Sequence, residues 1–324
     1  MKIRPFALIR LPKEREIFFL NEENSGGNKY FFTSFDNSKQ YKFYFSNFQN
    51  INASELEENF NILLKNNKNP QPISENDYLK LLQKTVQFLQ EKKTHKIVIS
   101  REKWVEKTNI QPLKSFLFLC QKYPNSFCHL SFWNEKEVWL GATPEILGTY
   151  ENSTFRTMSL AGTLPDDENF QWSEKERTEQ QFVTDYIREK LQNFSEEITA
   201  DGAKDLHLGH VKHLVTSFSA RLKDENLLPL LIQSLHPTPA VCGLPLETSR
   251  DFILENESYD RDFYTGYIGL ETPKFKKYFV NLRSGKLYLN GALLFIGGGI
   301  TAQSDPEKEW QETELKSRFV GESL

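Results

Sequence analysis

The stretch YFVNLRSGKLYLNGALLFIGGGI, residues 278–300, decides the fold class. Apolar and aromatic runs in it are separated by short polar segments, and the same pattern starts at about residue 264. This is typical of consecutive strands joined by tight turns. Neighbouring strands of such a meander pair antiparallel, so the sequence predicts an antiparallel sheet at this end of the chain.

Strand patterns continue outward from this stretch toward the N-terminus. Residues 1–50 carry the aromatic runs YFFTSF and YKFYFSNF. Further strands are predicted at FCHLSFW (127–133), EVWL (137–140), EILGTY (145–150) and TFRTMSL (154–160), with turns at NEKE and ENST. Because hairpins outnumber strand–helix–strand units, we expect an α+β fold with largely antiparallel sheets flanked by helices.

Helical patterns interrupt the strands at a few places. Ser74 and Asp77 form a start that resembles a capping box, and an apolar face follows at helical spacing: Tyr78, Leu81, Leu82, Thr85 and Leu89. Other helices are predicted at 112–123, 172–191, 226–235 and from about 306, where Pro306 falls in the first turn and Ser304 or Asp305 is the cap.

Composition excludes several classes of protein. The 324 residues suffice for one large domain or two small ones. A net charge of −4 without a long basic run argues against nucleic acid as the main partner. No apolar run approaches the roughly 20 residues that span a bilayer, and the charged N-terminus does not resemble a signal peptide. Cys120, Cys128 and Cys242 form no CxxC pair, so we expect reduced thiols and a cytoplasmic location.

Lys96 stands directly before the apolar run Ile97–Ile99. A lysine at the end of a strand is ordinarily solvated. The alternative is that a buried strand carries Lys96 into a site, and the local pattern leaves both possibilities open.

Two predicted helices place glutamates beside an apolar face. An apolar stripe is formed by Phe182, Val183, Tyr186 and Ile187. Glu179 lies three residues before Phe182 and four before Val183, at the spacing of the same helix face. A carboxylate there must be paired, protonated or bound to a metal, unless the stripe simply ends before it.

The last helix repeats this anomaly. Leu315 and Phe319 are expected to mark its inward face, with Glu312 and Lys316 beside it and Glu309 one turn earlier. An ordinary surface ion pair would explain Glu312 and Lys316. Two carboxylates from separate helices, completed by water and substrate oxygens, are also what Mg²⁺ prefers.

Glycines and one arginine add a candidate binding surface for an anion. Gly297, Gly298 and Gly299 follow a strand directly, which suggests backbone close to a ligand. Arg283 ends the preceding strand and suits bidentate binding of a carboxylate, although an arginine at a hairpin edge is the plain alternative. His207, His210 and His213 share the segment HLGHVKH, but the spacing does not favour zinc; a single His213 at a polar site is the better hypothesis.

Ten motifs in order from about residue 95 to 320 resemble the chorismate-utilising enzymes, and among them the isochorismate synthases. They are HKIVISR, WLGATPEIL, LAGTLP, ERTEQQFV, VKHLVTSF, LHPTPAVCGLP, YDRDFYTGYIG, VNLRSG, FIGGGI and EWQETELK. In YTGYIG, Thr265 stands where similar proteins often have a first glycine. Residues 1–90 match poorly and are expected to be a variable N-terminal part of one structural domain, with residues 91–324 as its chorismate-binding core and residues 50–72 as a connection.

The resemblance implies antiparallel sheets and helices around a central pocket that binds chorismate through Mg²⁺. It implies Glu179 and Glu312 as metal ligands, with Glu309 and His213 as neighbours of the metal. The substrate contacts that it implies are Gly162, His213, Ala240, Arg283, Gly297 and Lys316.

The resemblance also implies the chemistry of an isomerase. Lys96 would be the general base that takes a proton from the water attacking C2 of chorismate. Glu145 would be the general acid that protonates the departing C4 hydroxyl. An exposed lysine is almost wholly charged at pH 7, so this role needs a perturbed site, and burial would help Glu145 to keep its proton. The product would be isochorismate, for menaquinone or siderophore biosynthesis, without an organic cofactor.

Related activities fit the motifs less well. Ammonia-using relatives lack a lysine base at Lys96, or carry a lysine nucleophile where this chain has Ala161, so no amidotransferase subunit is expected. Salicylate synthases, which go on to eliminate pyruvate, share the lysine base; Pro239 and Ala240 resemble the plain isochorismate type instead. A chorismate-binding protein without catalysis is a further alternative. A monomer is the default, because no coiled coil appears.

Overall fold

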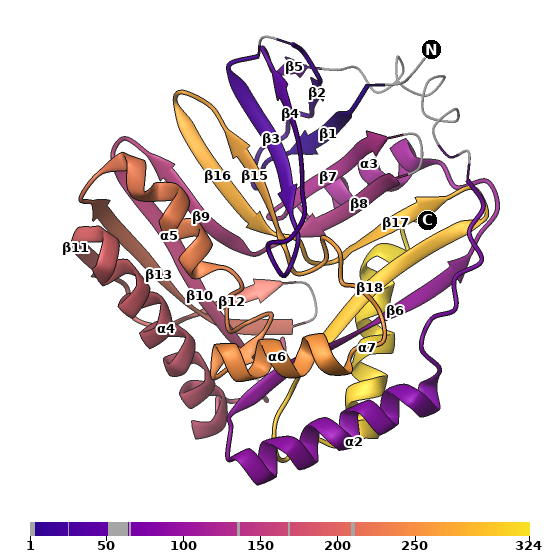
Figure 1. Cartoon of the computed structure of the whole chain (residues 1–324), viewed down its shortest axis with the longest axis vertical. Coiled ribbons are helices and arrows are strands. Elements are labelled where there is room, and N and C mark those ends of the chain that lie inside the picture. Colours follow the sequence, from indigo (N-terminus) through magenta and orange to yellow (C-terminus); the bar gives the residue numbers. More distant parts are fainter. Residues whose placement is uncertain are drawn as a thin grey trace.

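The computed structural model describes residues 4–324 except 25, 51–63, 65, 135–136, 168 and 209–210. Most of the predicted connection 50–72, part of the predicted turn NEKE and His210 therefore lie outside the described residues. Within them, the strands form two nine-stranded sheets, and every strand pair is antiparallel (Figure 1). The predicted α+β fold with largely antiparallel sheets is confirmed.

The first sheet has the strand order β14-β6-β18-β17-β8-β7-β1-β2-β5. In chain order its strands are β1 (Phe6–Arg10), β2 (Phe18–Asn21), β5 (Gln49–Asn50), β6 (Lys96–Glu106), β7 (Phe127–Asn134), β8 (Glu137–Thr143), β14 (Gly243–Leu244), β17 (Ser284–Tyr288) and β18 (Gly291–Ile300).

The second sheet has the order β11-β13-β10-β9-β16-β15-β3-β4, with β12 paired to β13. Its strands are β3 (Asn28–Thr33), β4 (Gln40–Phe45), β9 (Ile146–Glu151), β10 (Thr154–Pro165), β11 (Ser195–Ala200), β12 (Lys204–Leu208), β13 (Val211–Leu222), β15 (Tyr267–Glu271) and β16 (Phe275–Val280). The predicted meander therefore splits: β15 and β16 belong to this sheet, whereas β17 and β18 belong to the first.

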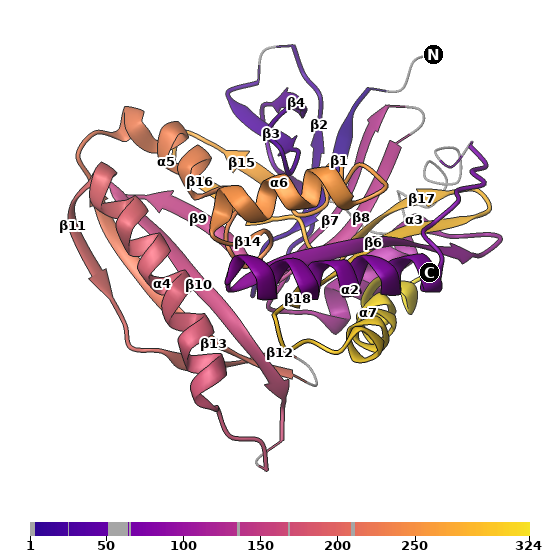
Figure 2. The same cartoon turned by 60° about the horizontal axis from the view of Figure 1, so that its bottom comes forward.

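Helices cover the outer faces of the two sheets (Figures 1 and 2). α2 (Glu75–Lys92) and α7 (Pro306–Gly321) pack on β6 and β18, and α3 (Pro112–Lys122) packs on β7 and β8. α4 (Glu174–Phe194) and α5 (Leu228–Leu235) cover the second sheet, while α6 (Leu246–Asn256), which the sequence analysis did not predict, lies against β6 and β14; a short 3₁₀ turn spans Glu225–Leu227.

A core rich in aromatic residues fills the space between the sheets. It takes side chains from both of them, so it ties them together. The rings of Tyr30 on β3 and Trp133 on β7 stack with centroids 5.7 Å apart and planes 8° apart. Burying such rings is strongly favourable, which explains why the strands of residues 1–50 belong to the same sheets as the rest of the chain.

The predicted start of α2 is confirmed in detail. The Ser74 side chain accepts a hydrogen bond from the Asp77 backbone N–H, which satisfies one of the free donors of the first turn. The buried residues are those of the predicted stripe: Tyr78, Leu81, Leu82, Thr85 and Leu89.

The predicted inward face of α7 is wrong at Leu315, whereas Phe319 is half-buried with its ring against Arg283; the cap, Asp305, is as expected. Leu315 is 59% exposed, and the buried residues are Thr313, Ser317 and Val320. α7 packs against β18, and the Thr313 hydroxyl accepts a hydrogen bond from Arg101 Nε at 2.9 Å. Small polar side chains therefore suit the contact face, and the apolar pattern of the helix was misleading.

Candidate active site

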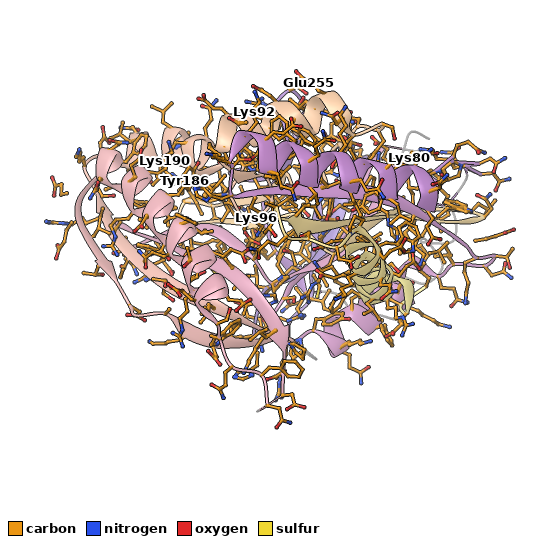
Figure 3. The ribbon with its side chains drawn as sticks, turned by 90° about the horizontal axis from the view of Figure 1, so that it is seen from below. Lys80, Lys92, Lys96, Tyr186, Lys190 and Glu255 are labelled. Carbon is orange, nitrogen blue, oxygen red and sulfur yellow. The ribbon has the colours of Figure 1, made fainter. Side chains whose placement is uncertain are left out.

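Lys96 begins β6, and its side chain lies on the same face of the sheet as Gly299. β6 pairs with β18 so that Val98 lies opposite Gly299, and side chains two apart share a face. Figure 3 shows Lys96 between α4 and α7, below α2 in that view. The side chain is 16% exposed, so the strand carries Lys96 into the interior and does not leave it solvated.

Gly299 makes room for the lysine. A Cβ added to Gly299 would lie 2.3 Å from Lys96 Cε and 3.0 Å from its Nζ. No other residue type could occupy this position while Lys96 keeps its place. The run of glycines therefore has a specific reason at Gly299: it lets the lysine lie directly on the strand.

Glu179 on α4 forms an ion pair and hydrogen bond with Lys96 Nζ. Its side chain is 25% exposed, at the edge of the helix face that buries Val183 and Ile187. The misplaced glutamate is thus paired in this structure, and its partner is the predicted general base.

Glu312 and Lys316 on α7 lie 2.5 Å apart as an ion pair. Lys316 Nζ also donates to the Gly297 carbonyl at 3.2 Å. The positive charge of Lys316 is the main cause that lowers the pKa of Glu312, and Lys96 contributes to the same shift. Glu309, one turn earlier, lies near the position that a Cβ of Gly298 would take, 3.3 Å from its Oε2.

Glu145 lies in the connection between β8 and β9 and is 7% exposed. Burial raises its pKa to about 7; a hydrogen bond from the Thr238 hydroxyl, at 3.5 Å, and the charge of Lys96 oppose that rise. The raised pKa favours the protonated form of Glu145 near neutral pH. Ala240, half-buried, follows two residues after Thr238 in the same loop.

His213 on β13 contacts Gly162 on β10, and Nδ1 lies 2.9 Å from the Gly162 carbonyl oxygen. A carbonyl only accepts, so Nδ1 carries the proton. Burial lowers the pKa of His213 to about 4, which keeps the ring neutral at pH 7. Gly162 has φ +67°, a conformation that favours glycine.

Arg283 follows β16, immediately before β17, and has φ +49°. Its guanidinium lies 4.0 Å from the ring centroid of Phe319. Burial lowers its pKa to about 10, so it remains charged at neutral pH. None of the carboxylates in the described part of the chain forms a salt bridge with Arg283, which fits a group that awaits an anion.

Electrostatic influence connects these groups into one site. The charges of Arg283, Lys316 and Glu179 all act on His213, and Lys96 acts on both Glu145 and Glu312. His207, in contrast, is exposed and pairs with Asp166 at 2.7 Å. His210 lies outside the described residues, so the structure describes no zinc site made by all three histidines of HLGHVKH.

The donor chemistry fits a magnesium ion that substrate helps to hold. No three His, Cys, Asp or Glu side chains form a ready metal group among the residues that the structure describes. However, Mg²⁺ commonly takes one or two carboxylates and completes its shell with water and substrate oxygens. The site holds three cations and three carboxylates, so these charges cancel: Lys96, Lys316 and Arg283 against Glu179, Glu309 and Glu312. A substrate with two carboxylates would add two negative charges. A divalent ion would balance them.

Two further residues border the site, and the sequence analysis assigned no role to either. Thr238 contacts Glu145, and a Cβ on Gly297 would lie 3.1 Å from the Tyr264 hydroxyl. Both lie within motifs quoted above, LHPTPAVCGLP and YDRDFYTGYIG. The next residue, Thr265, has φ +58°, a conformation that favours glycine.

Two antiparallel sheets and a cluster of cations and carboxylates brought together from distant elements are the features that a comparison with known proteins must match. The chain belongs to the family of chorismate binding enzymes, whose family model matches residues 29–324.

Named relatives agree with this membership. The chain is 35% identical over 200 residues to the chloroplastic isochorismate synthase of Catharanthus roseus, covering 58% of this chain and 34% of that protein. It is 34% identical over 237 residues to the salicylate biosynthesis isochorismate synthase of Pseudomonas aeruginosa, covering 69% of this chain and 47% of that protein. The chain thus spans a third to a half of the length of these relatives.

A solved structure supports the fold. The menaquinone-specific isochorismate synthase MenF of Escherichia coli superimposes with a TM-score of 0.84 over 99% of this chain and 89% of that one. The sequence identity is 20%, so this likeness concerns the fold alone.

Proposed function

We propose that this chain is an isochorismate synthase, an isomerase that adds water at C2 of chorismate and releases the C4 hydroxyl reversibly. The observation that carries the proposal is the pair of Lys96 and Glu145. One is a lysine brought inside by its strand, and the other is a buried carboxyl with a pKa raised to about 7. Addition of water with loss of hydroxyl needs one group to remove a proton and one to supply a proton.

Glu145 suits the acid. With a pKa of about 7, it holds a proton in a large share of molecules at neutral pH and can still release it. The charge of Lys96 is one of the causes that oppose the rise. When Lys96 is neutral, as a base must be, this cause disappears and Glu145 holds its proton more firmly. The two protonation states that the reaction needs therefore favour each other.

Lys96 suits the base by its position. It lies on Gly299 and reaches Glu179, so its amine is fixed by two contacts. To accept a proton from water, the amine must leave Glu179. Rearrangement of Glu179 when substrate and metal bind would release it.

Arg283, Lys316 and Gly297 are proposed as anchors for the substrate carboxylates, and Gly162, His213 and Ala240 as walls of the substrate site. Arg283 supplies a desolvated cation without a carboxylate salt bridge among the described residues. Lys316 donates to the carbonyl of Gly297, the first residue of the glycine run. A desolvated cation binds an anion more strongly than a solvated cation does.

Glu179 and Glu312 are proposed to hold Mg²⁺, with Glu309 as its neighbour. When bound, the ion would supply positive charge for a substrate carboxylate and so help to orient the ring. Lys96 and Lys316 form ion pairs with the two proposed ligands. The lysines and the ion thus compete for the same carboxylates.

Product analysis tests the function directly. The purified protein is incubated with chorismate, once with Mg²⁺ and once with EDTA. We expect approach to a chorismate–isochorismate equilibrium only with Mg²⁺ and without pyruvate. Salicylate with pyruvate would assign the chain to the salicylate synthases, and Mg²⁺-dependent binding without turnover would leave a chorismate-binding protein.

Several broader features remain part of the proposal. We place the chain in the cytoplasm, as a monomer without an amidotransferase subunit, and its product in menaquinone or siderophore biosynthesis. None of the described helices is long and apolar enough to cross a membrane. We also propose residues 1–90 as a variable part and residues 91–324 as the core of one domain; the pairing of β1 with β7 and of β3 with β15 supports the single domain.

A further inference from the structure

α7 carries three of the proposed site residues on one face and is held in the fold by another. Glu309, Glu312 and Lys316 follow one another three and four residues apart, so they share a face of the helix. The buried residues Thr313 and Ser317 lie on a neighbouring face. The place of the site residues therefore depends on what holds the buried face.

Two cations of β6 contact the buried face of α7. Arg101 Nε donates to the Thr313 hydroxyl at 2.9 Å. Lys103 Nζ donates to the Ser317 hydroxyl at 3.1 Å. Both cations also form an ion pair with Glu314, which lies between the two hydroxyls in the sequence. The Arg101 side chain is only 3% exposed, so little water competes for its contacts.

The spacing of these contacts on the strand matches their spacing on the helix. Arg101 and Lys103 are two residues apart, which places them on one face of β6 and about 6.6 Å apart along it. Thr313 and Ser317 are four residues apart, which is about 6.0 Å along α7. Two contacts at matching spacing fix the helix both along its axis and around it.

The helix itself orients each hydroxyl toward its cation. Thr313 Oγ1 donates to the Trp310 carbonyl at 2.7 Å. Ser317 Oγ donates to the Glu314 carbonyl at 2.7 Å. A hydroxyl has one proton, so each oxygen can otherwise only accept, and β6 supplies the donor. The Arg101 guanidinium also lies over the Trp310 ring, 4.0 Å from its centroid.

We propose that Arg101, assisted by Lys103, is a positioning residue that holds α7 at the rotation bringing Glu312 to the metal and Lys316 to the substrate. This inference rests on the proposed function of those two residues. Mg²⁺ demands near-ideal octahedral geometry at about 2.0–2.1 Å. The outer atoms of a helix lie about 5.5 Å from its axis, so a rotation of about 10° moves them by about 1 Å. Such a shift removes a metal contact and leaves the helix folded.

β6 then serves the proposed site from both of its faces. Lys96 and Arg101 are five residues apart on this strand, so their side chains lie on opposite faces. The pairing of β6 with β18 runs without a register shift from Ile97 to Glu106. One strand therefore fixes both the proposed base and the helix that carries a proposed metal ligand.

Two substitutions of the fully buried Thr313 separate position from stability. Thr313→Ser keeps the hydroxyl and loses a methyl group, whereas Thr313→Val keeps the shape and loses the hydroxyl. The affinity of the full chain for Mg²⁺ alone is measured by calorimetry, together with the melting temperature. We expect Thr313→Val to bind Mg²⁺ about 10- to 100-fold more weakly, and Thr313→Ser to keep wild-type affinity although it melts at a lower temperature. Wild-type affinity in Thr313→Val, or equal weakening in both variants, overturns the inference.

A second pair of variants tests Arg101 itself. Arg101→Gln should weaken Mg²⁺ binding by the same factor of about 10 to 100 and lower kcat/KM for chorismate. The matched control is Lys122→Gln, which breaks an exposed ion pair with Glu322, directly after α7, and should change neither quantity. Equal effects of the two substitutions would refute the role of Arg101. Should Arg101→Gln not fold, the two Thr313 variants decide.

The outcomes also separate this inference from the proposed function. A wild type that binds Mg²⁺ and converts chorismate, with Arg101→Gln and Thr313→Val unaffected, rejects the positioning role alone. A wild type that neither binds Mg²⁺ nor converts chorismate rejects the proposed function, and the positioning role with it.

Discussion

Replacing Gly299 with alanine would move the proposed base without touching it. The new Cβ would lie 2.3 Å from Lys96 Cε, whereas ordinary contact begins at 3.4 Å. The lysine must therefore shift by about 1 Å (3.4 − 2.3 = 1.1). A misplacement of about 1 Å can cost about 100-fold in rate, or about 2.7 kcal/mol of transition-state stabilisation. Gly299 is not among the residues with positive φ, so alanine fits the backbone.

The assay is kcat/KM for chorismate, together with the melting temperature. We expect about 100-fold loss of kcat/KM with little change in melting temperature, because the clash involves the flexible end of a side chain. Gly298→Ala is the matched control, since its Cβ would point to the other face of β18 and meet only Glu309 Oε2 at 3.3 Å. Wild-type kcat/KM in Gly299→Ala, or an equal loss in Gly298→Ala, would refute the reasoning.

Further outcomes are expected at four other residues. Lys96→Gln should lower kcat by about 10²- to 10⁴-fold at unchanged melting temperature; near-normal turnover would exclude Lys96 as the base. Activity should fall above about pH 7 as Glu145 loses its proton, and Glu145→Gln should lose turnover at every pH. The pKa of Glu145 in the folded protein lies above its ordinary 4.5. The free energy of unfolding that this group contributes is therefore fully present below pH 4.5 and falls by about 3 kcal/mol as the pH rises through 7. Glu145→Gln should for this reason melt at a higher temperature than wild type at pH 8. Glu179→Ala should lose activity and bind Mg²⁺ more weakly by calorimetry; unchanged affinity would exclude it as a ligand. Arg283→Gln should raise KM more than it lowers kcat, and an unchanged KM would argue against a carboxylate anchor.

Local sequence patterns predicted many of the helices and strands. The cap and the buried face of α2 follow from residues a few positions apart, so the sequence predicted them residue by residue. α7 shows the limit of this method. Its cap was predicted, but its buried face was not, because β18 and Arg101 select small polar residues over Leu315. α6 gave too weak a pattern to be predicted at all.

The candidate site divides in the same way. Glu179 and Glu312 were predicted as candidate site residues because the sequence alone shows a charge beside an apolar helix face. The pairing of Glu179 with Lys96 was not visible, since the two lie 83 residues apart. Nor was the contact between Thr238 and Glu145, which are 93 residues apart. Contacts of this kind depend on which strands become neighbours, and the local sequence does not state that.

The sequence by itself determined the antiparallel α+β character of this protein, most of its helices and strands, and the resemblance that points to chorismate. Periodicity, capping residues and turns are local, so the chain carries them wherever it folds. Only the tertiary structure decided that β15–β16 and β17–β18 part into two sheets, that Lys96 lies on Gly299 beside Glu179, and that burial lifts the pKa of Glu145 to about 7. Those properties arise from desolvation and from contacts between distant segments, which exist only after the sheets have packed.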